Sequence, residues 1–159
     1  MYHHQNLPDP RPHTPDDLSR INHTPFMRAS HITITALAGD RAAGELEVLP
    51  GMLNHHGFVH GGVLTMLADT VAGTAAGARG GRCVTLDNTM HYLRPAVGGR
   101  IFCTAEPVRV GRTISTVDAV LTDQEGRLVA RGTFTFHINR GIQQIPAQPD
   151  TGGQSTGHH

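Results

Sequence analysis

One carboxylate, Asp69, stands in the middle of a long apolar stretch. The spacing of the apolar residues predicts a helix over residues 60–79 whose circumference is mostly apolar, so we expect this helix to be largely buried. A carboxylate on such a helix is costly unless it is paired or has a function. Asp69 could act in catalysis, or it could lie on a partly exposed stripe or cap a neighbouring backbone group. The apolar residues are Val63, Leu64, Leu67, Ala68, Val71, Ala72 and Ala75.

The segment that leads into this helix runs from Asn54 to Gly62 and ends in His60-Gly61-Gly62. Two glycines at a helix start lower helix propensity, but they permit close approach by a ligand. The first N–H groups of a helix have no partner within it, and they lie at the positive end of the helix dipole. Such a terminus suits an anion, or a carbonyl that becomes one during attack. The alternative is a tight loop-to-helix connection without a ligand.

The distance between these two features predicts how they could cooperate. Gly61 and Asp69 are eight residues apart, which is about 12 Å along a helix axis. Groups that act on one carbonyl should each lie about 3 Å from it. One subunit could hardly bring both to the same atom, whereas two antiparallel helices from two subunits could. The helix carries a narrow stripe of small and polar residues that would allow such an approach: Gly62, Thr65, Asp69, Gly73 and Gly77.

The elements around the helix read mainly as β-strands. Residues 18–28 predict a short helical turn, and the order of the rest is β-β-α-β-β-β-β. The last two runs alternate, with Val117, Ala119 and Leu121 on one face of the first and Leu128, Ala130, Phe134 and Phe136 on one face of the second. An antiparallel sheet wrapped around one buried helix is an α+β fold. The predicted strands cover residues 31–38, 41–49, 82–93, 100–110, 113–123 and 127–138.

The ends of the chain lack a pattern that would form a core. Residues 1–17 predict a disordered arm and residues 140–159 a disordered tail, which leaves a domain over residues 18–139. The 13 basic and 13 acidic side chains balance, so nothing indicates a nucleic-acid or membrane partner. The sequence has no apolar run of membrane-spanning length and does not begin with an apolar signal stretch, so we expect a cytoplasmic protein.

Cys83 and Cys103 are the two cysteines of the chain. If residues 82–93 and 100–110 form a hairpin, these two side chains lie too far apart to form a disulfide. We therefore expect two free thiols in a reducing compartment.

The residues singled out above resemble a known family. The pattern Asn-x-x-Gly-x-x-His-Gly-Gly followed by Leu-x-Asp resembles the hotdog-fold acyl-CoA thioesterases of the PaaI-like (phenylacetyl-CoA and 4-hydroxybenzoyl-CoA thioesterase) superfamily. The resemblance implies hydrolysis of an aryl- or fatty-acyl-CoA to the free acid and CoA. Here the pattern starts at Asn54 and ends at Asp69, and the resemblance covers roughly residues 25–138. It continues through Thr85-Leu86-Asp87, Tyr92-Leu93-Arg94-Pro95, Val110-Gly111-Arg112-Thr113 and Gly126-Arg127-Leu128-Val129-Ala130.

The resemblance implies a role for each matching residue. Asp69 would attack the thioester or activate water, and Asn54 would help to place the nucleophile or the water. Gly61 would polarise the thioester carbonyl with its N–H, with His60 beside it, and Thr85 would orient water near the aspartate. The resemblance also implies a homodimer with shared active sites that pairs into a tetramer. Gly62, Arg94 and Arg112 match positions that meet the substrate or the CoA phosphates, although both arginines could be ordinary surface residues.

Coenzyme A would enter as part of the substrate, with no other cofactor. A metal site is not expected, because His55, His56 and His60 lack the accompanying carboxylate or cysteine spacing of known sites. Two other functions remain open at this point. A hotdog hydratase or dehydratase would need an acid and a base around a carbon–carbon double bond, such as His60 and Asp69. A non-catalytic acyl-CoA-binding module would usually add a DNA-binding helical domain, for which residues 1–30 are too short.

Overall fold

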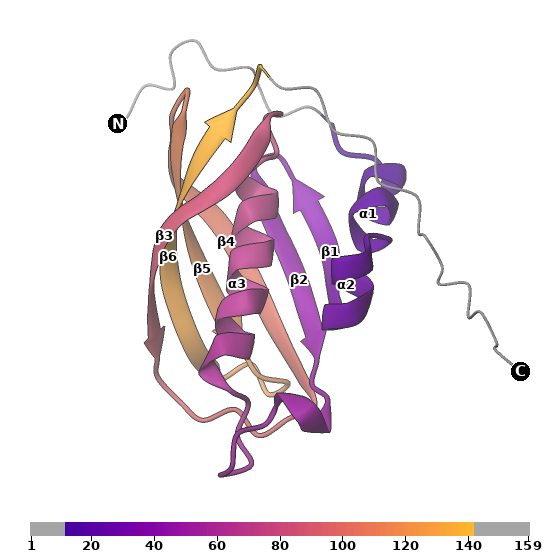
Figure 1. Ribbon diagram of the computed structural model, residues 1–159, viewed down its shortest axis with the longest axis vertical. Coiled ribbons are helices and arrows are strands. Elements are labelled where there is room, and N and C mark those ends of the chain that lie inside the picture. Colours follow the sequence, from indigo (N-terminus) through magenta and orange to yellow (C-terminus); the bar gives the residue numbers. More distant parts are fainter. Residues whose placement is uncertain (1–11, 142–159) are drawn as a thin grey trace, which may run out of the picture.

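The protein folds as a curved six-stranded sheet with one long helix across it and two short helices at one edge (Figure 1). The structure is a computed structural model, and it describes residues 12–141. The helices are α1 (Pro15–Asn22), α2 (Pro25–Ser30) and α3 (Gly61–Ala76), with a 3-10 turn, η1, at Pro50–Met52. The strands are β1 (Ile32–Ala38), β2 (Arg41–Glu47), β3 (Arg82–Tyr92), β4 (Arg100–Val110), β5 (Ile114–Thr122) and β6 (Leu128–Asn139).

The sheet is antiparallel throughout and has the strand order β1-β2-β4-β5-β6-β3. This arrangement confirms the predicted α+β hotdog fold. Residues 82–93 and 100–110, whose pairing as a hairpin was assumed in the argument on the cysteines, do not pair with each other: β3 pairs with β6, and β4 pairs with β2 and β5. After β3 ends, the N–H groups of Leu93 and Arg94 bond to the carbonyl of Val129, which keeps the chain beside β6. Cys83 and Cys103 are nevertheless both free, as expected.

The inner faces of β5 and β6 form much of the core with α3. Val117, Ala119 and Leu121 are fully buried, as the alternation predicts. Leu128, which was expected on the buried face, is 40% exposed instead. The β5–β6 ladder shifts register next to it, between Leu121 and Thr122, so the two-residue alternation fails there and Val129 is buried in its place.

Helix α3 packs closely on the sheet at Gly44 in β2. A Cβ atom at this glycine would lie 2.8 Å from Cγ2 of Val71 in the middle of α3. Val71 is fully buried, so it has no room to move away. The packing of α3 onto β2 therefore requires glycine at position 44.

The folded domain begins earlier than residue 18. Helix α1 starts at Pro15, and Thr14 caps it: the backbone N–H of Thr14 donates to Oδ2 of Asp17 at 3.0 Å, and the N–H of Asp17 donates to Oγ1 of Thr14 at 3.4 Å. The single helical turn predicted over residues 18–28 is two helices, because Pro25 has no N–H with which to continue α1 and instead begins α2. Arg140, assigned to the tail, donates to the carbonyls of Gly111 and Arg112. The disorder predicted for residues 1–11 and 142–159 lies outside the described residues.

Asn22 ties α1 to the edge of the sheet. Its Nδ2 donates to the carbonyl of Ile34 at 2.9 Å, and its Oδ1 accepts from the N–H of Ile34 at 2.8 Å. Ile34 lies where the β1–β2 register shifts, between Ile34 and Ala36. The asparagine amide thus takes the place of a neighbouring strand for both backbone groups of a buried residue.

We expect Asn22→Ala to lower the free energy of unfolding by about 1–3 kcal/mol, because both backbone groups of Ile34 would lose their partner. Chemical denaturation followed by circular dichroism would measure the change. Ser19→Ala is the matched control, because the hydroxyl of Ser19 on the same helix contacts His23 rather than the sheet. Equal stability of the two variants would show that Asn22 does not anchor α1.

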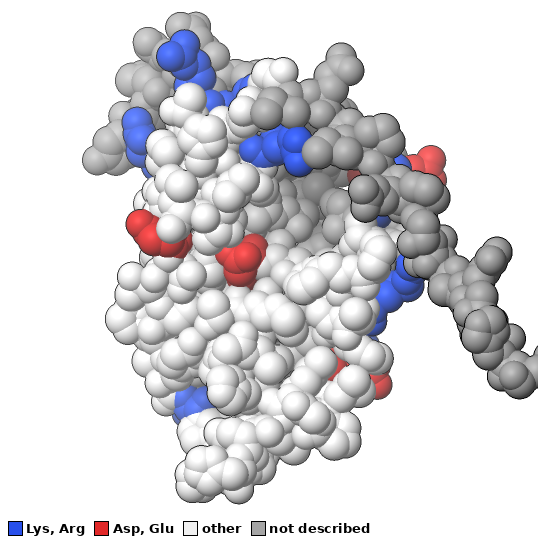
Figure 2. Space-filling view, viewed as in Figure 1, with Lys and Arg blue, Asp and Glu red and all other residues white. Residues whose placement is uncertain are grey.

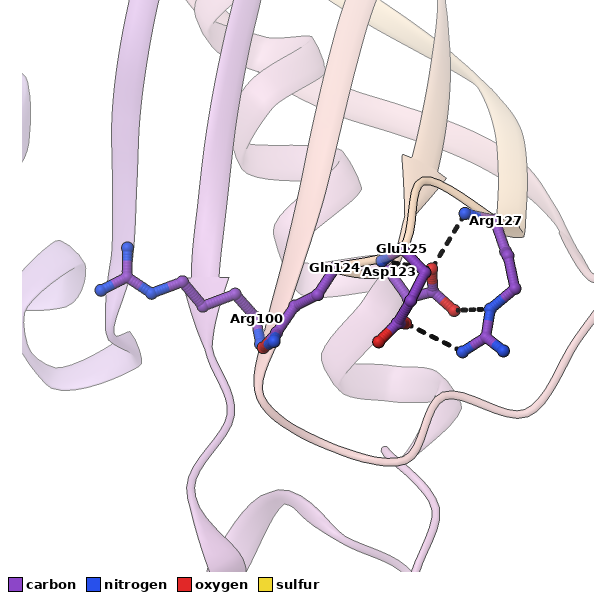
Figure 3. Close-up of polar contacts among 5 residues, drawn as sticks. All are labelled: Arg100, Asp123, Gln124, Glu125 and Arg127. Carbon is purple, nitrogen blue, oxygen red and sulfur yellow. Dashed lines mark hydrogen bonds and ion pairs between the residues drawn. The ribbon is translucent and has the colours of Figure 1, made fainter.

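The turn between β5 and β6 is held by one carboxylate. Oδ1 of Asp123 accepts from the backbone N–H groups of Glu125 at 3.1 Å and Arg127 at 2.9 Å, and Oδ2 accepts from Nε of Arg127 at 2.7 Å (Figure 3). Partial desolvation opposes ionisation of Asp123, but the hydrogen bonds and charge of Arg127 outweigh it and hold the pKa of this carboxyl below its usual range. Gln124 accepts from the N–H of Arg100 at 2.7 Å, which links the turn to the start of β4.

Candidate active site

Asp69 and Thr85 form a hydrogen-bonded pair between α3 and β3. Oγ1 of Thr85 donates to Oδ1 of Asp69 at 2.8 Å. Both residues are half-buried, on the side of α3 that faces away from the core. Because the hydroxyl proton of Thr85 is used on Oδ1, the second carboxylate oxygen, Oδ2, is left for a substrate or a water molecule.

A cavity of about 710 Å³ lies beside this pair. The outer side of α3 and the start of β3 form one wall, and α1 forms the opposite wall. Cys83 also lines the cavity, and its Sγ donates to the carbonyl of Gly73 at 3.3 Å. Burial raises the pKa of the Cys83 thiol, and the charge of Asp69 adds to this, so Cys83 stays protonated near neutral pH. On this wall of the cavity the Asp69 carboxylate, rather than the Cys83 thiol, is therefore the candidate nucleophile or base.

The N-terminus of α3 lies at a second place in the fold. His60 is the N-cap, and its Nδ1 accepts from the N–H of Gly62 at 2.9 Å. The N–H of Gly61 has no hydrogen-bond partner in residues 12–141. Gly61, rather than Gly62, thus presents a backbone donor that a substrate oxygen could use.

The loop before α3 is shaped by Asn54. Its Oδ1 accepts from the N–H groups of His56 at 2.9 Å and Phe58 at 3.2 Å, so this side chain holds the loop in a tight turn. Asn54, Gly61 and Arg94 line a hollow of about 320 Å³. This hollow and the cavity at Asp69 share no lining residue among those described. The sequence-predicted site residues therefore form two separate groups within one subunit.

Comparison with known proteins shows the family. Residues 56–130 match the thioesterase superfamily. A Mycobacterium tuberculosis protein, named as a candidate esterase, is 34% identical over 143 residues, which cover 86% of this chain and 98% of that protein. Acyl-coenzyme A thioesterase 13 of Mus musculus is 30% identical over 111 residues, which cover 67% of this chain and 79% of that enzyme. This chain belongs to the thioesterase superfamily.

The solved structures agree with this assignment. The PaaI protein of the Escherichia coli phenylacetic acid degradation operon superimposes with a TM-score of 0.71 at 27% identity, over 76% of this chain and 88% of that one. The chain described here is thus a PaaI-like hotdog thioester hydrolase, as its motifs predicted. No helix in the described part of this thioesterase is long and apolar enough to cross a membrane.

The two candidate CoA-binding arginines of this thioesterase lie far apart. Arg94 follows the end of β3 and lines the smaller hollow with Gly61. Arg112 lies in the turn between β4 and β5, at the level where β3 begins. Both side chains are exposed. One subunit does not bring them together, because the length of β3 separates them.

Some residues at the two hollows of this thioesterase had no predicted role. The hydroxyl of Tyr92 lies 2.6 Å from Oγ1 of Thr65, and the ring lies 3.3 Å from where a Cβ atom of Gly61 would be. Tyr92 was named from the sequence only as part of the family motif, and no role was predicted for it. Asp17 and Arg20 of α1 line the cavity at Asp69. The capping box formed by Thr14 and Asp17 could have predicted this helix from the sequence. It could not have predicted that the helix lies opposite α3. The part of the chain that the structure describes holds no group of three or more metal-ligating side chains.

Proposed function

We propose that this thioesterase hydrolyses acyl-CoA, with Asp69 as nucleophile or general base and the N–H of Gly61 from a second subunit as the donor to the carbonyl. The observation that carries the proposal is the Asp69–Thr85 pair, which opens into a cavity large enough for an acyl group. The mouse relative, named as an acyl-coenzyme A thioesterase, supports this substrate class.

The reaction can follow either of two routes at Asp69. As a base, Oδ2 takes a proton from water while the water oxygen bonds to the thioester carbon. As a nucleophile, Oδ2 bonds to that carbon itself, and water later cleaves the mixed anhydride. In both routes the carbonyl oxygen becomes negative and accepts from Gly61, and the carbon–sulfur bond then breaks. The sulfur leaves as the CoA thiol, with the proton that Asp69 took from water in the first route and with a proton from solvent water in the second.

A dimer through β3 supplies the second subunit in this proposal. In the described residues β3 is an edge strand, and its side chains Val84 and Leu86 are 63% and 56% exposed. The opposite edge, at β1, is covered by α1 through Asn22, whereas no helix within residues 12–141 is tied to the free edge of β3 in this way. Figure 2 shows few charged side chains on the face over α3 and β3. Such an edge favours pairing with a second copy.

A two-fold axis at β3 would reverse one subunit relative to the other. The N-terminus of α3 in one subunit would then approach the middle of α3 in its partner, which would bring Gly61 toward Asp69. The same reversal would place Arg94 of one subunit at the end of the sheet where its partner has Arg112. We therefore propose both arginines as contacts for the CoA phosphates, with CoA entering only as part of the substrate. Pairing of dimers into tetramers and a cytoplasmic location remain proposals, the latter supported by two free thiols.

A thiol-release assay tests the proposed function. The purified protein is mixed with a panel of short-chain, long-chain, phenylacetyl- and 4-hydroxybenzoyl-CoA, and free CoA is followed with a thiol reagent. We expect turnover of at least one acyl-CoA. Hydration of an enoyl-CoA without thiol release would instead identify a hydratase, and binding of acyl-CoA without either reaction would identify a non-catalytic module.

A further inference from the structure

The cavity at Asp69 is bordered by two glycines, Gly73 within α3 and Gly77 at the C-cap of the same helix. Gly73 and Gly77 lie four and eight residues after Asp69, so they follow it by about one and two turns on the same side of α3. The open space beside them is continuous with the Asp69 carboxylate, because all three residues line the same cavity.

The fold itself does not require glycine at these positions. A Cβ atom at Gly73 would lie 3.4 Å from the ring of Phe136, and one at Gly77 would lie 3.4 Å from the carbonyl of Gly73, both ordinary contact distances. Gly77 has a φ of −81°, which alanine adopts readily. This differs from Gly44, where Val71 leaves no room for a Cβ atom. Glycine destabilises a helix relative to alanine, so a role outside the packing of α3 on its own sheet is the better account of Gly73.

The opposite wall of the cavity is fixed in place and charged. Helix α1 is held by Asn22 at Ile34 and, just before the helix, by a 3.0 Å hydrogen bond between Nε2 of His13 and the carbonyl of Gly39. It presents Asp17 and Arg20 to the cavity, joined by an ion pair of 2.6 Å. Asp17 is 5% exposed and Arg20 is 71% exposed, so the pair spans from the inside of this wall to its rim.

We propose that this cavity is the acyl subsite, that Gly73 and Gly77 set its width beside Asp69, and that the Asp17–Arg20 pair limits acyl length. The inference rests on the proposed acyl-CoA hydrolysis. A compact apolar acyl group would occupy the space at the glycines, against the ring of Phe136. A long alkyl chain would have to lie against the charged pair and remove water from it without replacing its hydrogen bonds, which is unfavourable. The site therefore selects compact acyl groups over long chains.

The test compares kcat/KM for acetyl-, hexanoyl- and dodecanoyl-CoA in matched variants. We expect the wild type to prefer hexanoyl- to dodecanoyl-CoA. Arg20→Leu makes the wall apolar and should raise the dodecanoyl-to-hexanoyl ratio by about 10-fold, within the range for a few methylene contacts. Arg41→Leu is the control, because Arg41 is 73% exposed and also ion-paired, with Glu106 on β4, but does not line this cavity. It should leave the ratio unchanged.

Gly73→Ala tests the width of the cavity. It should lower kcat/KM for hexanoyl-CoA by about 10-fold, while acetyl-CoA changes by less than about 3-fold. Its melting temperature should not fall, and its sedimentation should match that of the wild type. An unchanged chain-length ratio in Arg20→Leu, or an equal loss for all substrates in Gly73→Ala, overturns this inference alone. Equal loss together with dissociation of the oligomer would assign Gly73 to helix packing between subunits. A wild type that hydrolyses no acyl-CoA would overturn the proposed function as well.

Discussion

Asp69→Asn is expected to lower kcat for acyl-CoA hydrolysis by about 100-fold or more, the usual range for loss of a general base. The asparagine side chain keeps the shape of the carboxylate and can still accept from Thr85, but it has no negative charge with which to attack or to take a proton. Binding of the substrate should change much less, because Asp69 acts on the carbonyl rather than on the CoA moiety. Steady-state kinetics with the best acyl-CoA of the panel would measure kcat, and calorimetry with a slowly hydrolysed analogue would measure binding.

The chain offers a close control for this substitution. Asp118 on β5 also accepts a hydrogen bond from a threonine, Thr133, at 2.6 Å, but the pair lies in a different part of the sheet and outside the cavity at Asp69. Asp118→Asn makes the same chemical change and should leave kcat within about 2-fold, as for most surface substitutions. If Asp69→Asn keeps a near-normal kcat, or if both variants lose activity equally, the proposed mechanism is wrong.

A mixture of two inactive variants is expected to recover activity. Asp69→Asn lacks the carboxylate, and Gly61→Pro lacks the N–H that polarises the carbonyl, while proline is tolerated at the first position of a helix. If the sites are composite, a mixed dimer has one site with both groups intact and one with neither. With complete subunit exchange, half of the dimers are mixed and have one whole site, so about a quarter of the wild-type activity should return.

Two measurements make the mixing experiment decisive. Gly61→Ala keeps the N–H but places a Cβ atom about as close to the ring of Tyr92 as the proline does. This variant therefore measures the effect of the added Cβ atom alone, and it should retain most of the activity. Subunit exchange is followed by mass spectrometry of differently labelled subunits. A mixture that stays inactive despite complete exchange would place Asp69 and its donor in one subunit and would refute the shared site.

The sequence alone predicted the α+β class of the fold and the residues that we propose for the site. Alternation in β5 and β6, the apolar circumference of α3 and the glycine-rich entry at His60-Gly61-Gly62 are local patterns, and each reflects burial or backbone geometry that neighbouring residues decide. Asp69 could be recognised because one carboxylate in an apolar helix conflicts with its surroundings. The same local reasoning failed at Leu128, where a register shift interrupts the alternation.

Only the tertiary structure decided which distant residues meet. The pairing of β3 with β6 rather than β4 brings Thr85 to Asp69, and it leaves β3 at the edge of the sheet. The position of α1 across the cavity depends on Asn22 meeting the two backbone groups of Ile34, twelve residues later in the chain. Contacts of this kind depend on how strands order themselves and how helices pack on them. That order follows from the burial of the whole apolar surface at once, so no short stretch of sequence determines it.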